Sequence, residues 1–157
     1  MLATGVAVAI GLLALTASAS AASLVYIKDH NVWIADPDGS NAHQVTRGGT
    51  AEVPWNSPTM SDDGTIAAVK DFHVHLLRQN GEEIRSFVPR NPAGTTSGVH
   101  GVNFSPDGTK LSYAKVSLGG CIAADCDTRG ISAVMDLKGN TLAEEQEYTG
   151  GFPSWVT

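Results

Sequence analysis

Basic residues are scarce in this chain. Its 157 residues include 10 Lys and Arg against 16 Asp and Glu, which gives a formal net charge of -6 at pH 7. Proteins that bind nucleic acids carry clustered Lys and Arg that neutralise phosphate groups. Nothing in this composition favours such binding, so we expect no nucleic-acid partner.

Cysteine is scarcer still, because Cys121 and Cys126 are the only two in the chain. No His and no second Cys pair lies near them in sequence, so a metal site would lack ligands. In an exported protein, two cysteines this close favour a local disulfide. Closing a six-residue loop would contribute roughly 2 kcal/mol, enough to fix a loop but not to hold a fold.

Long hydrophobic runs are absent except at the N-terminus, where residues 6–15 are apolar and broken only by Gly. Small residues at 17–21 offer cleavage sites, so residues 1–22 have the pattern of a secretory signal peptide. No Lys or Arg precedes the run, and the alternative is an uncleaved membrane anchor that is short for a span. We therefore expect export to the periplasm or the extracellular space.

Helical periodicity is also missing beyond residue 23. Segments of strand length, rich in β-branched or aromatic residues, are bounded there by Gly, Pro, Asp or Asn. These segments are 24–27, 31–35, 65–70, 73–78, 83–88, 110–116 and 131–136. The pattern predicts an all-β protein.

Two kinds of turn alternate along the chain. The first is SDDG at 61–64 and SPDG at 105–108, with glycines 44 residues apart, and the second ends at Gly39, Gly81 and Gly139. Periods of 40 to 45 residues with four short strands are typical of propeller blades. We expect the Asp-Gly pairs to form tight two-residue hairpins and to be structural. The predicted structural turn residues are Asp38, Gly39, Asp63, Gly64, Pro106, Asp107 and Gly108.

The interval from Gly81 to Gly139 is longer than the period, which we attribute to extra residues at 117–130, where the cysteines lie. The polar segment 91–101, which carries His100, is predicted to be a flexible connection between blades. A further marker recurs one residue before the first turn. It is Met60, then Phe104, and Trp155 stands in the same position of a last copy.

The segment FSPDGTKLSY resembles the repeat of TolB-like β-propellers, which is related to the WD-type repeat and to the propeller of prolyl oligopeptidase-type enzymes. The resemblance covers about 24–157. In MSDDGTIAAV, Asp62 replaces Pro, and the copy in GFPSWVT stops before its Asp-Gly. The resemblance implies four-stranded antiparallel blades in which the marker residue lies on the innermost strand.

The predicted blades comprise residues 24–46 with three strands, 57–88 with four and 101–146 with four, and 152–157 would begin another innermost strand. About three blades make an incomplete propeller, because four to eight are needed to close one. We expect either a fragment that lacks C-terminal blades or a half-propeller that closes by self-association.

Candidate chemistry is sparse. His73 and His75 share one face of a strand, a spacing that can bind a metal, but they occupy ordinary strand positions of the repeat. We therefore favour a packed or surface pair over a metal site. The acidic residues lie in turns, where Asp caps backbone N–H groups. There is no G-x-S-x-G elbow and no phosphate-binding glycine loop, and we expect no cofactor.

Two functions remain open. The first is an exported, non-catalytic scaffold that binds a protein or peptide partner, as the resemblance to TolB implies. The second is the N-terminal propeller of an exported prolyl oligopeptidase-type serine hydrolase, with the catalytic domain absent from these residues. A weaker third interpretation is a propeller enzyme that acts on sugars through turn acids and histidines.

Overall fold

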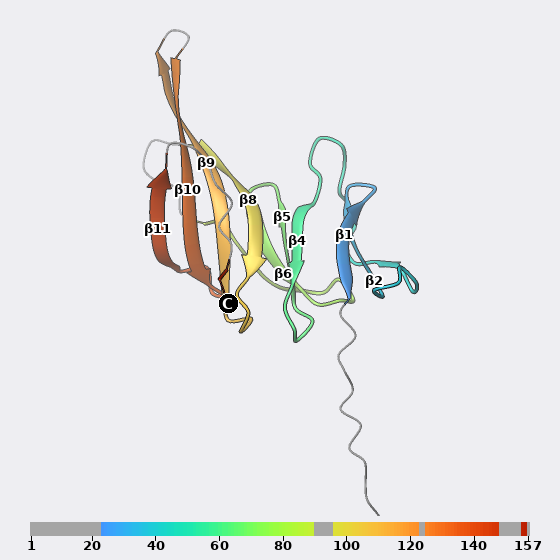
Figure 1. Ribbon diagram of the computed structural model, residues 1–157. Helices are drawn as coiled ribbons and strands as arrows, with labels where there is room; N and C mark the ends of the chain where they lie inside the picture. The colour runs from blue at the N-terminus through green and yellow to red at the C-terminus, as the bar shows by residue number, and fades with distance from the viewer. Residues whose placement is uncertain (1–22, 90–95, 123–124, 148–154, 157) are drawn as a thin grey trace, which may run out of the picture.

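The strands form three antiparallel sheets. The computed structural model describes residues 23–89, 96–122, 125–147 and 155–156, and contains no helix within them (Figure 1). The first sheet contains β1 (Leu24–Lys28), β2 (Asn31–Ala35) and β3 (His43–Gln44). The second contains β4 (Asn56–Met60), β5 (Ile66–Lys70), β6 (His73–Leu77) and β7 (Glu83–Phe87). The third contains β8 (Thr96–Phe104), β9 (Lys110–Ile122), β10 (Asp125–Asp136) and β11 (Thr141–Glu147).

Each sheet is a meander in which strands that follow one another in sequence are neighbours. The sheets stand side by side along the chain, with β4 between β1 and β8 (Figure 1). Repeated antiparallel meanders that pack face to face are the arrangement of propeller blades. The predicted all-β fold of incomplete propeller blades is therefore confirmed. Within the described residues, no helix is available to cross a membrane.

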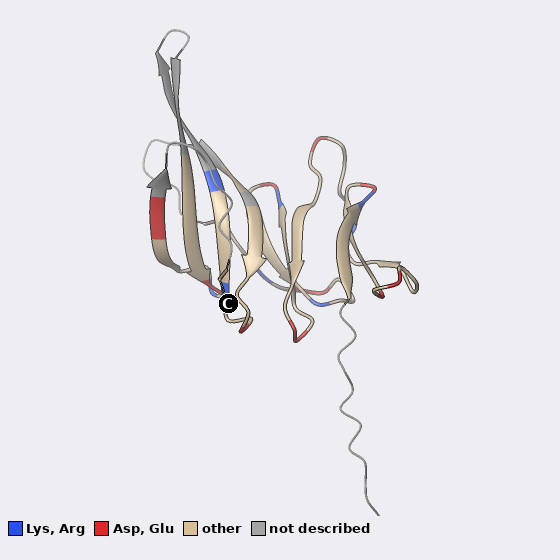
Figure 2. Ribbon diagram, viewed as in Figure 1, with Lys and Arg blue, Asp and Glu red and all other residues tan. Residues whose placement is uncertain are grey.

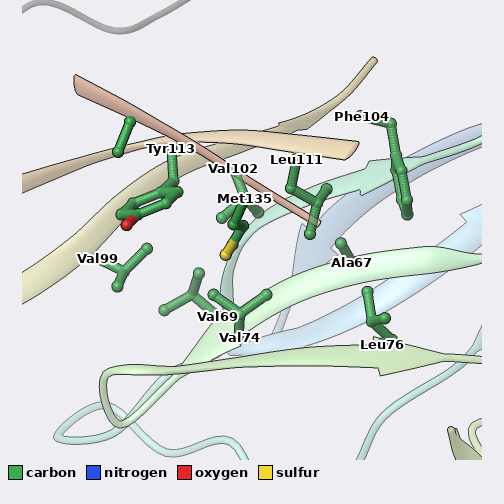
Figure 3. Close-up of a cluster of buried hydrophobic side chains, with 11 residues drawn as sticks. Ala67, Val69, Val74, Leu76, Val99, Val102, Phe104, Leu111, Tyr113 and Met135 are labelled. Atoms are coloured by element: carbon green, nitrogen blue, oxygen red, sulfur yellow. The ribbon is translucent and has the colours of Figure 1, made fainter. Parts of the chain in front are cut away.

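The central strands of the second sheet, β5 and β6, contribute buried side chains to both faces. Ile66 and Ala68 on β5 pack with Val32 and Ile34 of the first sheet. Ala67 and its neighbours on β5 and β6 pack instead against the third sheet (Figure 3). That cluster contains Ala67, Val69, Val74, Leu76, Val99, Val102, Phe104, Leu111, Tyr113, Ala133 and Met135. Because successive side chains of a strand point to opposite faces, burial on both sides requires the continuous apolar run found in β5.

The Asp-Gly turns differ from the predicted two-residue hairpins. In SPDG the N–H of Gly108 donates to the carbonyl of Ser105 at 2.8 Å, and φ is positive at Gly108 but not at Asp107. Ser, Pro and Gly at the first, second and fourth positions suit a type I turn, which this bond closes. The two-residue turns with positive φ at both positions are Asp29–His30 and Asp71–Phe72, which contain no glycine.

Two segments outside the predicted strands belong to strands. Residues 117–122 and 125–130 extend β9 and β10 into a long hairpin that projects beyond the other strands (Figure 1). Residues 96–101 of the predicted connection belong to β8, which pairs with β9 from Thr96 onward. Glycines and polar residues in these segments resemble loop composition, but pairing with a neighbouring strand satisfies their backbone groups. Residues 90–95 lie outside the described part.

Several expectations fall outside the described residues. They include the signal peptide or anchor at 1–22 and most of the predicted innermost strand at 152–157. Of that strand, Trp155 and Val156 are described, and neither has strand conformation. The observed sheets span residues 24–44, 56–87 and 96–147. The blades were predicted at residues 24–46, 57–88 and 101–146.

Gly39 and Gly81 provide a matched test of the contact between the first two sheets. Both close equivalent turns with positive φ, but a Cβ at Gly39 would meet nothing, whereas one at Gly81 would collide with the Val45 carbonyl. We predict that Gly39→Ala lowers the free energy of unfolding by about 1 to 2 kcal/mol from backbone strain alone. Gly81→Ala should cost clearly more in urea denaturation. Equal losses would contradict this account of the contact.

Candidate functional site

The SPDG turn is stabilised by the Asp107 carboxylate. Ser105 Oγ donates to Asp107 Oδ1 at 2.6 Å, and the backbone N–H of Thr109 donates to the same oxygen at 3.1 Å. The Lys110 N–H donates to Ser105 Oγ at 3.0 Å, which links the turn to the start of β9. These bonds satisfy backbone groups that the reversal of the chain would otherwise leave unpaired.

The SDDG turn repeats this geometry. Ser61 Oγ donates to Asp63 Oδ1 at 2.6 Å, and the Thr65 N–H donates to the same oxygen at 3.0 Å. Asp62 stands where SPDG has Pro106, and the hydrogen bonds of the turn do not use its carboxylate. The exposed Asp62 side chain therefore adds a negative charge without supporting the turn.

These hydrogen bonds lower the pKa of the turn carboxylates. The hydrogen bond from Ser105, followed by those from Thr109, holds the pKa of Asp107 well below its usual range. Ser61 and Thr65 lower the pKa of Asp63 in the same way. All bonds are donated to the charged form, which is the form that they favour.

The two turns and the β10–β11 turn enclose a groove of about 650 Å³ between the second and third sheets. The lining residues are Ser61, Asp62, Asp63, Pro106, Asp107, Gly108, Thr109, Asp136, Leu137 and Lys138. Gly108 lies against Ser61, so a Cβ there would come within 3.4 Å of the Ser61 Cβ. The groove thus lies where the two repeated turns meet.

The groove is bordered by negative charge. Asp62, Asp63, Asp107 and Asp136 line it against a single cation, Lys138, and Figure 2 shows acidic turns at this end of the sheets. The Asn140 side chain donates to Asp136 at 2.8 Å and is the main cause of the lowered pKa of that carboxyl. The groove therefore combines an anionic rim with apolar atoms.

The predicted histidine pair lies away from this groove. His75 Nδ1 donates to Glu83 Oε2 at 2.6 Å, and its ring meets Trp55 edge-on at 4.8 Å between centroids. His73 Nδ1 donates to the Asp71 carbonyl at 2.7 Å. In the part of the chain that the structure describes, no three His, Cys, Asp or Glu side chains gather to hold a metal ion. His75 therefore links β6 to β7 and to Trp55.

The sequence analysis did not predict a buried cation, Lys115. The Lys115 side chain on β9 is fully buried, and its Nζ lies 3.6 Å from Glu144 Oε2 and 6.0 Å from the Tyr113 ring centre. Burial also raises the pKa of Tyr113. Side chains two residues apart on a strand share a face, so Lys115 lies on the same face of β9 as Leu111 and Tyr113. This alternation is the sequence pattern from which the burial of Lys115 could have been predicted.

The two cysteines are placed opposite each other by the backbone. In the β9–β10 hairpin, Ile122 pairs with Asp125 and Cys121 with Cys126. Opposite residues in antiparallel strands have Cα atoms about 4.5 to 5.5 Å apart, which is within the range for a disulfide. The cysteine side chains lie outside the described part, so the disulfide stays a prediction. His100 has its backbone on β8, and its side chain is likewise not described.

Comparison with known proteins gives no family. No protein-family model and no curated protein matches the chain. A crystal structure of a protein of unknown function from Bacteroides caccae aligns with 16% identity and a TM-score of 0.47, over 74% of this chain and 36% of that chain. A chain of the mitotic checkpoint complex aligns with 10% identity and a TM-score of 0.42, over 80% and 47%. This chain therefore spans less than half of either.

Protonation of Asp107 provides a test of the turn. A carboxyl with a lowered pKa in the folded state stabilises the protein above its unfolded pKa of about 3.9, and this contribution disappears as the pH falls toward the folded value. We predict that Asp107→Asn lowers stability at pH 7 and that its difference from the unmodified protein shrinks below about pH 4. Urea denaturation at pH 7 and pH 3 measures this.

The matched control is Asp62→Asn, which removes a neighbouring carboxylate that the turn does not use. Its free energy of unfolding at pH 7 should stay within about 0.5 kcal/mol of the unmodified protein. An Asp107→Asn effect of equal size at both pH values would show that charge on Asp107 does not stabilise the turn.

Proposed function

We propose that the chain is an exported, non-catalytic scaffold of the TolB-like propeller type that binds a protein or peptide partner. The single observation that carries this proposal is the groove of about 650 Å³ between the repeated turns of two sheets. Its volume lies within the range of about 300 to 1,000 Å³ that is common for ligand sites. The SPDG repeat supports the TolB-like assignment, and the apolar run at 6–15 supports export.

The groove has the chemistry of a docking site rather than of a catalytic one. The hydroxyls that line it are occupied, because Ser61 Oγ donates to Asp63 and Thr109 Oγ1 donates to Asp107 at 2.9 Å. These hydroxyls hold the turns in place. The turns in turn fix the carboxylates at the rim, so a partner meets a pre-organised surface that costs little entropy to bind.

The negative charge of the rim favours a partner segment that is positively charged. Four carboxylates and Lys138 line the groove, and Lys110 Nζ lies 3.8 Å from Asp107 Oδ2, so the charge around the apolar atoms of Pro106 and Leu137 remains net negative. Such a rim attracts Lys and Arg over a distance and repels acidic segments. We therefore propose a partner segment that is basic and interrupted by apolar side chains.

The test uses a fluorescein-labelled peptide of sequence KLKAKLK and a matched peptide in which Glu replaces every Lys. Anisotropy titration should show binding of the basic peptide that weakens as salt rises, and no binding of the acidic one. Asp62→Lys should raise the Kd of the basic peptide about threefold to tenfold, which corresponds to roughly 0.7 to 1.4 kcal/mol.

Glu52→Lys is the control for Asp62→Lys, because it makes the same charge change in the exposed loop between β3 and β4. That loop lies at the opposite end of the sheets from the Asp-Gly turns (Figure 1). Its Kd should stay within about twofold of the unmodified protein. Equal losses in the two variants would indicate non-specific charge attraction and would contradict binding in the groove.

A further inference from the structure

Two histidines on β6 share one face of the second sheet. His73 and His75 are two positions apart, and side chains with this spacing on a strand point to the same side. Their ring centres lie 6.0 Å apart, and the ring planes are inclined at 42° to each other. Leu77, two positions further along, packs with residues of the first sheet. The pair therefore faces the first sheet, whereas the groove lies between the turns of the second and third sheets.

Each imidazole donates the hydrogen on its Nδ1 atom to an oxygen. His73 Nδ1 lies 2.7 Å from the carbonyl oxygen of Asp71, and His75 Nδ1 lies 2.6 Å from Glu83 Oε2. A backbone carbonyl and an ionised carboxylate can only accept a hydrogen bond, so the hydrogen of each neutral ring is on Nδ1. The Nε2 atom of each ring therefore carries an unshared electron pair.

This arrangement is the one found at metal-binding histidines. Such a residue binds the ion through one ring nitrogen and donates the other ring N–H to a carboxylate, a backbone carbonyl or water. The second bond fixes the tautomer and the orientation of the ring. The spacing in the sequence favoured a packed or surface pair, and the hydrogen bonds on both Nδ1 atoms are the structural observation that favours ion binding.

The position of Glu83 depends on a bulge in β7. The pairing of β6 with β7 shifts register at Ile84, which has no residue opposite it. Because of this extra residue, Glu83 lies on the same face as Ser86, although the two are three positions apart. Ser86 Oγ donates to Glu83 Oε1 at 2.9 Å. The carboxylate is thus bound at both oxygens and holds the His75 ring in one orientation.

The other neighbours of the pair allow a cation to approach. Trp55 meets His75 edge-on, with ring centres 4.8 Å apart, and the His75 side chain keeps 17% of its surface exposed. His73 is exposed. Lys70 pairs with His73 across the sheet, but its Nζ donates to a carbonyl in the loop between β3 and β4 at 2.8 Å. The Glu83 carboxylate places a negative charge beside the pair.

The repeat shows that the fold does not require histidine at these positions. The segments VWIADPDG, VHLLRQNG and SAVMDLKG align without gaps and identify the equivalent residues in the other two sheets. The equivalents are Asn31 and Ile131 for His73, and Trp33 and Ala133 for His75. Polar, aromatic and aliphatic side chains occupy the same places, so paired histidines are a property of the second sheet alone.

We propose that His73 and His75 bind one divalent ion of the Cu²⁺, Ni²⁺ and Zn²⁺ class through their Nε2 atoms. An ion about 2.0 to 2.1 Å from each Nε2 lies roughly 3 Å from each ring centre, so rings about 5 to 6.5 Å apart can share it. Imidazole suits these ions, whereas Ca²⁺ and Mg²⁺ take oxygen ligands. No third His, Cys, Asp or Glu of the described residues joins the pair, so water fills the other positions.

The direct test is calorimetric titration of Cu²⁺, Zn²⁺ and Mg²⁺ into protein that carries no histidine tag. Cu²⁺ should bind with about one ion per chain, Zn²⁺ should bind more weakly, and Mg²⁺ should not bind. His73→Asn leaves one imidazole and should raise the Cu²⁺ Kd about tenfold or more. Electron paramagnetic resonance of bound Cu²⁺ should show two nitrogen ligands in the unmodified protein and one in His73→Asn.

His43→Asn is the matched control. His43 on β3 is exposed and its Nδ1 lies 3.2 Å from the Asn41 carbonyl oxygen, but neither position 41 nor position 45 is histidine. Its Cu²⁺ Kd should stay within about twofold of the unmodified protein. Cys121→Ser/Cys126→Ser should also leave the Kd unchanged, which distinguishes imidazole from thiol ligands.

Glu83→Ala tests the hydrogen bond behind the site, because it keeps both imidazoles and removes the acceptor of His75 Nδ1. It should weaken Cu²⁺ binding about 10-fold to 100-fold. Glu83→Gln keeps an oxygen that can accept this bond and should recover part of the loss. An unchanged Kd in Glu83→Ala would contradict the role given to the carboxylate.

Absence of Cu²⁺ binding by the unmodified protein would overturn the proposal, as would equal losses in His73→Asn and His43→Asn. Circular dichroism shows whether each variant folds. A rise in the melting temperature of the unmodified protein with Zn²⁺, and not with Mg²⁺, requires no variant, since an ion that binds the folded state stabilises it. Titration with KLKAKLK should be the same in His73→Asn, so failure here and failure of the proposed function are separate results.

Discussion

The structure depends on the burial of the second sheet from both sides. β5 places Ile66 and Ala68 against the first sheet and Ala67 and Val69 against the third. A strand buried on both faces cannot follow the usual alternation of apolar and polar residues. The second sheet therefore supplies apolar surface to two neighbours, and each neighbour buries one face because the second sheet stands beside it.

The packing of three sheets in a row also explains which sheet faces are exposed. Among the described residues, the first and third sheets each have one face against which no other sheet packs. Leu24 is half exposed on the outer face of the first sheet, whereas Ile66 is buried against the first sheet and Leu111 against the second. The packing of each sheet on the next thus forms the core of the described residues.

The turns connect the fold to the proposed function. Packing of the second and third sheets brings SDDG and SPDG together, with Gly108 against Ser61. Ser and Thr donors bind one oxygen of Asp63 and one of Asp107 and lower the pKa of both carboxyl groups. Residues that are needed to reverse the chain thereby also set the charge of the groove. A structural role for the turns and a binding role for their outer surface are compatible.

The all-β class and the repeat could be predicted because turn residues and strand composition act locally. The strand extensions were missed because Gly119 and Gly120 look like breakers, while backbone pairing across β9 and β10 is decided by the partner strand. The type of the Asp-Gly turn was wrong, since hairpin statistics do not distinguish a type I turn closed by glycine from a two-residue loop.

The site was harder to predict than the fold. Each acidic residue of the groove was assigned to a turn from its local sequence, but the groove arises from contact between turns about 44 residues apart. Lys115 was missed for a related reason, because only the pairing of β9, β10 and β11 brings it to Glu144. Distances between repeats are set by sheet packing, which no single segment encodes.

Hydrogen exchange measured residue by residue tests the central claim most directly. If the second sheet is held from both faces, the amides of β5 and β6 exchange the slowest, at rates set by global unfolding. Amides of β1 and β11, which lie at sheet edges, exchange faster through local opening. Slower exchange in β1 or β11 than in β5 would contradict the account, because the stable centre would then lie outside the second sheet.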